Sequence, residues 1–142
     1  MKLCKLTSLL KRRQLCFTHL RKIKRRVSSE VVKAVEAGKI SVKVNAGNQT
    51  KHIKGSHNFI AGKSYILGNL EDCQTLISEL YGTGQALVKG NNGEFNNKER
   101  VRASQVFGVY VDEETKQESK TRYGIIHYGK AEAHIIPARS KE

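Results

Sequence analysis

Hydrophobic positions in the second half of the chain follow one helical pattern and then several short alternating patterns. Between the candidate cap Asn69 and the stop Gly82, apolar side chains recur at the three- and four-residue spacing of a helix face: Leu70, Cys73, Leu76, Ile77 and Leu80. The spacing predicts a helix over residues 69–81. Alternating or apolar runs bounded by turn residues predict strands after it, over residues 85–89, 94–96, 105–111, 122–127 and 133–136.

This order of elements predicts an α+β domain. An amphipathic helix must bury its apolar face, and the strands that follow supply a sheet on which it can pack. We expect the helix to lie on one face of an antiparallel sheet of about four or five strands. The last three strands should form a meander beneath it, with the charged residues 112–120 as a hairpin loop.

The pattern before this helix is weaker. Ser28 or Ser29 can cap a short helix that ends at Gly38, and the apolar alternation over residues 40–44 predicts a half-buried strand. Residues 45–64 are rich in Gly, Asn, His and Lys and have no period, which predicts a long ordered loop. Loops of this length inside a compact domain are often functional.

The N-terminal segment has a different composition from the rest. Residues 1–26 carry ten basic and no acidic side chains, whereas residues 27–142 carry sixteen basic and thirteen acidic ones, so the net charge of +13 is concentrated in this segment. Apolar residues recur in it at helical spacing. We therefore predict a basic amphipathic helical arm over residues 1–38, followed by a domain over residues 39–142. The arm is expected to dock on protein, to give salt-dependent affinity for nucleic acid, or to contact a membrane surface, but not to supply chemistry.

Cysteine usage and hydropathy indicate a cytoplasmic protein. The three cysteines are odd in number and lack CxxC spacing, so we expect free thiols in a reducing compartment rather than disulfides or a zinc site. Apolar runs are much shorter than the roughly 18 residues of a membrane span. Basic residues 11–13 also interrupt the only N-terminal apolar stretch, so neither a Sec-type signal peptide nor a membrane span is expected.

Four histidines of the domain fall in two places. His52 and His57 lie in the polar loop, and His127 and His134 lie on the last two strands. Their loose spacing among Lys and Gly does not match a metal-binding motif, so we expect no metal ion and no cofactor. The motifs GxxxxGK[ST], GxGxxG, GxSxG and HExxH are absent from the sequence. From the residues alone, two interpretations stay open: ordinary polar positions of a fold, or groups that act on a phosphodiester.

Cleavage of RNA without a metal needs three kinds of group. A base takes the proton of the ribose 2′-OH, an acid protonates the leaving 5′-oxygen, and cations balance the charge at phosphorus. Histidine can fill both proton roles near neutral pH. Charge could come from Lys51, Lys54 and Arg122, and hydrogen bonds to phosphate oxygens from Ser56, Thr121 or Tyr128.

A series of sequence blocks resembles one known family. The run 47–59, GNQTKHIKGSHNF, with Gly62-Lys63-Ser64-Tyr65 after it, resembles the opening Q-x-K-H-I-x-G-T/S signature of the bacterial toxin 50 domain, also called polymorphic toxin type 50. The later blocks of that family are matched in order by residues 79–84, 95–99, 108–112, 126–128 and 134–137. The resemblance covers about residues 44–139.

The resemblance implies a function and a site. Such domains occur at the C-termini of polymorphic toxins and of phage minor head proteins, and they are thought to be ribonucleases with the small α+β fold of barnase, EndoU and RelE. The implied activity is a metal-independent endoribonuclease toxin; the alternative is a phage or prophage structural or nucleic-acid-binding protein that keeps the fold without turnover. The implied partners are RNA, a cognate immunity protein and a phage head protein. By motif, the site residues are Lys51, His52, Ser56, His127 and His134.

The chemistry adds a geometric expectation. An acid and a base must flank one phosphate within roughly 7–10 Å of each other, so the loop that carries His52 should fold across the sheet toward His127 or His134. Strand alternation should turn His127 away from the core and Ile126 toward it. Arg122 is an odd number of residues from His127 and would then be at best an auxiliary phosphate contact. Lys54 and Tyr128 are expected to bind RNA phosphates.

Overall fold

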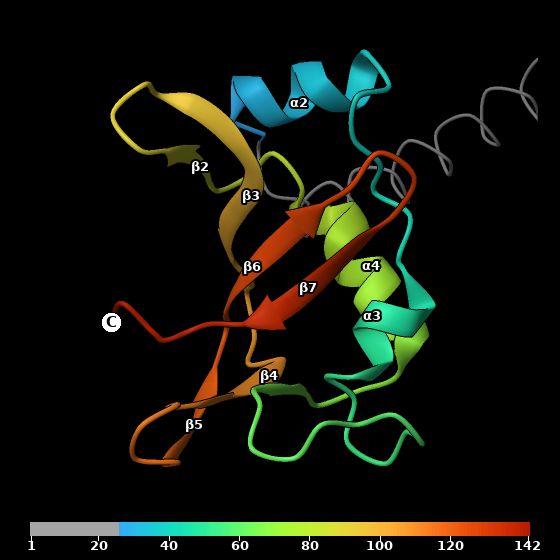
Figure 1. Cartoon of the computed structure of the whole chain (residues 1–142), viewed down its shortest axis with the longest axis vertical. Helices are drawn as coiled ribbons and strands as arrows, with labels where there is room; N and C mark the ends of the chain where they lie inside the picture. The colour runs from blue at the N-terminus through green and yellow to red at the C-terminus, as the bar shows by residue number, and fades with distance from the viewer. Residues whose placement is uncertain (1–25) are drawn as a thin grey trace, which may run out of the picture.

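The computed structural model describes residues 26–142, and most of the predicted basic arm lies outside the described residues. The described residues form three helices, α2 (Ser29–Glu36), α3 (Ala46–Thr50) and α4 (Leu70–Leu80). The strands are β1 (Tyr65–Ile66), β2 (Gln85–Lys89), β3 (Glu94–Arg102), β4 (Gly108–Val111), β5 (Glu118–Thr121), β6 (Tyr123–Tyr128) and β7 (Ala133–Pro137). The first two helices come before β1, and α4 lies between β1 and β2. Figure 1 shows these elements in order along the chain.

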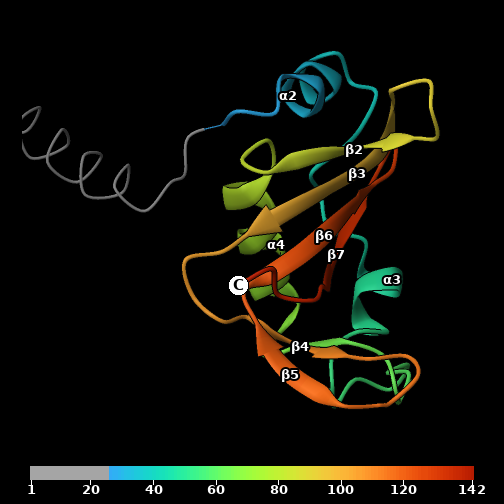
Figure 2. The same ribbon diagram turned by 90° about the vertical axis from the view of Figure 1, so that its left-hand side faces the viewer.

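The strands form two antiparallel sheets. The larger has the order β2-β3-β6-β7, and the smaller, β1-β4-β5, lies at one end of it (Figures 1 and 2). The predicted α+β class is confirmed. The predicted meander of the last three strands is wrong in one respect, because β4 belongs to the smaller sheet and β3 takes the place beside β6. The cause is the length of β3, which continues to Arg102 and pairs with β6 from Lys98 onward.

Helix α4 agrees with its prediction. Asn69 accepts a hydrogen bond from the backbone N–H of Asp72, and the Asp72 carboxylate accepts one from the backbone N–H of Asn69, each at 2.9 Å. This capping box fixes the start of the helix. Its apolar face is buried against alternate residues of the larger sheet, and the core comprises Cys73, Ile77 and Leu80 from α4 with Val101, Ile126 and Ile135 from β3, β6 and β7. One face of the sheet is therefore covered, and the other is open.

Helix α2 packs on the same core. Val31 is fully buried in it, and the backbone N–H groups of Val27 and Ser28 both donate to the carbonyl of Gly82. The Ser28 hydroxyl donates to the carbonyl of Gly84 instead of capping the helix. The predicted short helix is thus confirmed, while the division of the chain at residue 38 stays a prediction.

The predicted strand over residues 40–44 is absent, although Ile40 is buried and Val42 and Val44 are partly buried against the core. Only Val44 forms a bridge, to Ala133. The side chain of Gln74 on α4 accepts a hydrogen bond from the Val44 N–H at 2.8 Å and donates to the Val42 carbonyl at 2.9 Å. On its other side the segment bonds to β7 through Ala133, which donates to the Lys43 carbonyl and accepts from the Asn45 N–H, each at 2.7 Å. The segment is therefore held between α4 and β7 by a single bridge rather than a continuous ladder.

The loop over residues 45–64 is ordered by one short helix and one buried amide. Asn45 caps α3 by accepting from the Asn48 N–H at 2.9 Å, although no helix was expected here. The fully buried Gln49 then donates to the Ile135 carbonyl at 2.9 Å and accepts from the Ile135 N–H at 2.7 Å. Both bonds go to the backbone of β7, so this amide acts as a strand partner and pins the loop to the edge of the larger sheet.

Candidate functional site

The open face of the larger sheet carries a row of basic side chains. On β6 and β7, Ile126 and Ile135 point into the core, so His127 and His134 next to them point to the open face. The register pairs Lys98 on β3 with His127, and His127 with His134. Three neighbouring strands therefore place one cation and two imidazoles side by side.

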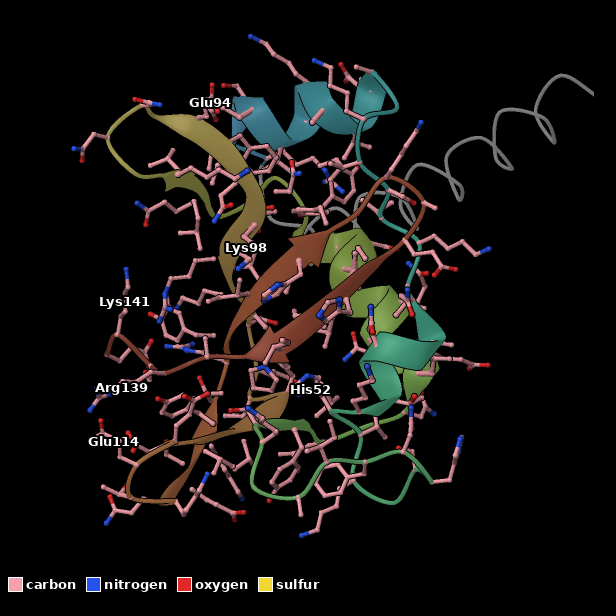
Figure 3. All side chains as sticks on the ribbon, viewed as in Figure 1. His52, Glu94, Lys98, Glu114, Arg139 and Lys141 are labelled. Atoms are coloured by element: carbon pink, nitrogen blue, oxygen red, sulfur yellow. The ribbon has the colours of Figure 1, made fainter. Side chains whose placement is uncertain are left out.

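His52 extends this row from the loop after α3. Its ring lies 6.5 Å from that of His134, at 11° between the ring planes, and His134 lies 4.9 Å from His127 at 17°. Figure 3 shows His52 and Lys98 flanking β6 and β7 from opposite sides. The expectation that His52 lies near a strand histidine is confirmed. The anchor that brings it there is Gln49, three residues earlier, on the edge of β7.

A hydrogen bond fixes the tautomer of His52. Its Nδ1 lies 2.8 Å from the carbonyl oxygen of Ser64, which can only accept, so Nδ1 carries a hydrogen and donates. Ser64 is itself held in place, because its hydroxyl accepts from the Val111 N–H at 3.0 Å. Nε2 is therefore the nitrogen of His52 that remains for proton exchange with a ligand.

The two strand histidines are biased toward the neutral form. Burial first, and then the neighbouring charges of His134, Lys98 and His52, together lower the pKa of His127 from 6.5 to about 4. Burial also lowers the pKa of His134, with His52 and Lys51 as the neighbouring charges. At neutral pH, His127 is therefore an unprotonated imidazole with a lone pair available to accept a proton.

A cavity of about 480 Å³ opens where the two sheets meet. His52 and His127 both line it, and His134 does not. Its walls also include one phenol, Tyr110, and three cations, Lys63, Arg100 and Arg139. They contain one carboxylate, Glu113, which lies 3.8 Å from the Lys63 ammonium, so cations outnumber acids in the wall. Ile125 and Ile136, on the open face of the sheet, form an apolar part of the lining. The cavity thus combines two imidazoles with several positive charges, an arrangement that suits a phosphate ester.

Arg100 has an unsatisfied donor in this wall. Its Nε is buried and has no hydrogen-bond partner, while one terminal nitrogen donates to the carbonyl of Arg139. The guanidinium carbon lies 5.4 Å from the centre of the Tyr123 ring, which helps to hold the side chain against the sheet. A buried donor without a partner is uncommon, and an anion in the cavity would supply one.

Comparison with protein-family models identifies the domain. Residues 44–137, more than half of the chain, match the family described as bacterial toxin 50. The chain belongs to this family. The match contains all three stacked histidines and almost every residue of the cavity wall. No curated protein matches the chain. None of the helices formed by residues 26–142 has the length and apolar character that a membrane span requires.

Other predicted residues of the toxin 50 site surround the histidines without joining the cavity. Lys51 is exposed, with its Nζ 3.4 Å from Asn48 Oδ1, and Lys54 lies over the Tyr65 ring at 5.2 Å. The Ser56 hydroxyl donates to the carbonyl of Thr50, which closes the turn after α3. Ser56 therefore shapes the loop that carries His52, and Lys51 adds charge beside His134.

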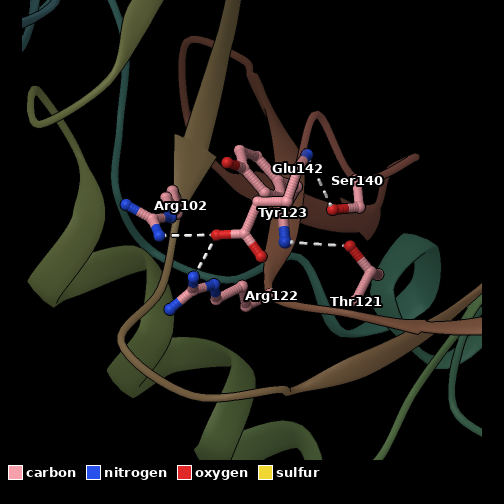
Figure 4. A network of polar contacts seen from close by, with 6 residues as sticks. All are labelled: Arg102, Thr121, Arg122, Tyr123, Ser140 and Glu142. Carbon is pink, nitrogen blue, oxygen red and sulfur yellow. Dashed lines mark hydrogen bonds and ion pairs between the residues drawn. The ribbon is translucent and has the colours of Figure 1, made fainter.

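Tyr128 and Arg122 lie away from the histidine row. Tyr128 is on the core face of β6, where its hydroxyl donates to the buried Glu99 carboxylate at 2.6 Å. Adjacent strand residues point to opposite faces, so Tyr128 and His127 do not share a site on a regular strand. Arg122 precedes β6 and pairs with Glu142 (Figure 4).

The sequence interpretation missed Lys98, Arg100, Arg139 and Lys63. A signal for the first two was present, since basic residues at positions 98, 100 and 102 alternate along one strand and must share a face. The strand predicted from the sequence ended at residue 96, so the alternating basic positions 98, 100 and 102 lay outside it. Arg139 and Lys63 carry no such local signal, because only the tertiary fold brings their segments to the cavity.

The geometry of the histidine row does not converge on a metal ion. Lone pairs of imidazole lie in the ring plane, and the stacked rings are nearly parallel, so their nitrogens do not point to one centre. Within residues 26–142, no group of three or more His, Cys, Asp or Glu side chains is arranged to hold a metal.

A second polar cluster lies on the core face, directly behind the cationic strand. Glu99 is fully buried and accepts hydrogen bonds from the backbone N–H groups of Gly82 at 2.9 Å and Gly84 at 2.8 Å, as well as from Tyr128. Only glycine fits at position 84, because an added Cβ would lie 1.9 Å from the carbonyl oxygen of Arg100. This cluster ties the turn after α4 to β3 and β6, so it positions the strand that bears Lys98 and Arg100.

Proposed function

We propose that this toxin 50 domain is a metal-independent endoribonuclease that cleaves RNA through attack of the ribose 2′-oxygen on the adjacent phosphorus. The observation that carries the proposal is that His52 and His127, from a loop and a distant strand, line one cationic cavity. Two groups able to transfer protons and cations able to stabilise a phosphorane are the requirements of this reaction.

The proton roles follow from the two environments. His127 is neutral in the free protein, so it serves as the base that takes the 2′-OH proton. His52 serves as the acid, with Nδ1 held by the Ser64 carbonyl and Nε2 delivering a proton to the leaving 5′-oxygen. The P–O5′ bond breaks as the P–O2′ bond forms, which yields a 2′,3′-cyclic phosphate and a free 5′-hydroxyl.

The surrounding residues hold these groups and balance charge. Arg100, Arg139 and Lys63 face the cavity and would stabilise the additional negative charge on the phosphate oxygens in the transition state. His134 stacks against both other rings without lining the cavity. We assign it a positioning role, since its stacking fixes the two outer imidazoles and its charge contributes to the low pKa of His127.

The direct test is incubation of the purified protein with single-stranded RNA in EDTA. We expect cleavage to continue, with products that end in 2′,3′-cyclic phosphate, whereas a DNA oligonucleotide of the same sequence stays intact because it lacks the nucleophile. Mass spectrometry of the products identifies the ends. RNA that stays intact across varied sequences would favour the non-catalytic alternative, and loss of cleavage on chelation would establish a metal-dependent reaction instead.

The pH dependence of kcat/KM tests the role of His127. A base must be unprotonated in the free enzyme, and protonation of His127 becomes extensive only as the pH falls toward its pKa of about 4. We therefore expect kcat/KM to show no acidic fall between pH 7 and about 5.5. Replacement of His134 by Gln removes one neighbouring charge that lowers this pKa, so the acidic limb should move to higher pH without loss of the reaction.

An acidic limb with a midpoint near the ordinary histidine value of about 6.5 in the unaltered protein would contradict this assignment. A circular dichroism measurement at each pH separates loss of activity from loss of fold. An acidic limb that does not move in His134→Gln would show that His134 does not act through His127.

A further inference from the structure

A second cationic cluster beside the cavity holds a carboxylate of the protein itself. Arg102, at the end of β3, donates from Nη2 to Glu142 Oε1 at 2.5 Å, and Arg122 donates from its own Nη2 to the same oxygen (Figure 4). The two arginines come from positions 20 residues apart and meet only through the pairing of β3 with β6. Neither side chain lines the cavity that contains His52 and His127.

This ion pair contributes little to holding the fold together. The side chains of Arg102, Arg122 and Glu142 are 49%, 31% and 47% exposed, and ion pairs open to water typically contribute at most about 1 kcal/mol. Hydrogen bonds from both arginines lower the pKa of the Glu142 carboxyl, so an ionised oxygen occupies the cluster at neutral pH. An anion from solution can therefore compete for the same donors.

The cluster has the donors that a nucleotide needs. Two guanidinium groups that converge on one oxygen match the way in which arginines bind phosphate. The Tyr123 ring lies beside Arg102 and Arg100, whose guanidinium carbons are 5.9 and 5.4 Å from its centre. Aromatic rings beside arginines commonly contact the bases of single-stranded nucleic acid.

Strand geometry connects this cluster to the histidines. Lys98, Arg100 and Arg102 alternate along β3 and so point to the same face, and the register places them opposite His127, Ile125 and Tyr123. At about 3.3 Å per residue, Arg102 lies roughly 13 Å from Lys98 along the strand. Three cations in a row therefore connect the histidine row with the arginine pair. A short stretch of RNA backbone can span the distance between the two sites.

We propose that Arg102 and Arg122 form a second phosphate subsite, which binds the RNA backbone beside the scissile phosphate, and that Glu142 occupies this subsite until RNA displaces it. The identification of the polyanion as RNA rests on the proposed function. The subsite itself rests on the two arginines and the carboxylate that they hold. Glu142 is then an internal competitor that weakens RNA binding.

The first experiment measures the affinity of the full chain for a fully 2′-O-methylated oligoribonucleotide, which cannot be cleaved by 2′-oxygen attack. Glu142→Gln is expected to bind roughly three- to fivefold more tightly than Glu36→Gln, since displacing a surface ion pair costs less than about 1 kcal/mol. Glu36→Gln is the matched control, because it removes one negative charge from an exposed position of α2. The double variants Arg102→Gln/Glu142→Gln and Arg122→Gln/Glu142→Gln should lose the gain. Equal affinity of Glu142→Gln and Glu36→Gln would overturn the proposal.

The second experiment does not depend on RNA. Carbon-detected NMR follows the titration of the Glu142 carboxyl in the full chain, with and without inorganic tripolyphosphate. Displacement by the anion should raise the pKa of Glu142 toward its ordinary value, and Arg122→Gln should raise it without any anion. A response to tripolyphosphate in a protein that does not cleave RNA would keep the subsite and refute the proposed function. RNA cleavage with no response in either experiment would keep the function and refute the subsite.

Discussion

Replacement of His52 or His127 by Ala should lower kcat for RNA cleavage by at least about a hundredfold, because a positioned proton-transfer group typically contributes 10²- to 10⁴-fold. Binding of the phosphate charge rests mainly on the cations Arg100, Arg139 and Lys63 of the cavity wall, so affinity for a 2′-O-methylated oligonucleotide should stay within about twofold. Single-turnover cleavage and fluorescence anisotropy measure the two quantities separately.

His57→Ala is the matched control for this prediction. His57 comes from the same loop as His52, is exposed, and belongs to neither the histidine row nor the cavity wall. Its replacement should leave kcat unchanged. Full activity in both His52→Ala and His127→Ala would refute the proposed roles, and a thermal unfolding curve for each variant would show that any loss does not come from misfolding.

Replacement of Glu99 by Ala should lower the free energy of unfolding by at least about 3 kcal/mol, since each of three donors left without a partner costs about 1–3 kcal/mol. The carboxylate accepts from Gly82 N–H, Gly84 N–H and Tyr128 hydroxyl, and all three donors would lose their acceptor. Tyr128→Phe removes only one of these bonds and should cost about 1.5–3 kcal/mol. Urea unfolding followed by circular dichroism gives both values.

Glu94→Ala provides the comparison on the same strand. Glu94 begins β3 and is exposed, so its replacement should change stability by no more than about 0.5 kcal/mol (Figure 3). A loss below about 1 kcal/mol in Glu99→Ala would show that water replaces the carboxylate at little cost. The cluster would then not be what holds β3 in register with the turn after α4.

Elements whose signals are local could be predicted from the sequence. The capping box of Asn69 and Asp72 and the helical spacing from Leu70 to Leu80 depend on residues within a few positions of each other, and α4 follows them closely. The same holds for β2, β6 and β7, whose limits differ from the predicted ones by at most one residue at either end. Alternation along β6 also indicated which face His127 would take.

The strand pairing could not be predicted in the same way. Whether β3 or β4 lies beside β6 depends on contacts between segments that are far apart in the chain, and hydropathy in either strand fits both arrangements. The structure extends β3 to Arg102, which places β4 with β1 and β5 and adds Lys98 and Arg100 to the open face. The division into two sheets in turn creates the cavity where they meet.

The candidate site shows the same division. Its histidines could be named from the sequence, because the family's blocks contain them, but their environment depends on the tertiary structure. Gln49 and Gln74 look like ordinary polar residues in the sequence. Yet the Gln49 amide bonds to the backbone of β7 and brings the loop there, while the Gln74 amide holds residues 42–44 against α4. The low pKa of His127 likewise comes from burial and from charges on three separate segments. Local sequence thus determined which candidate groups the domain carries, whereas only long-range packing decided which of them line one cavity, since distance, desolvation and charge all depend on residues remote in the chain.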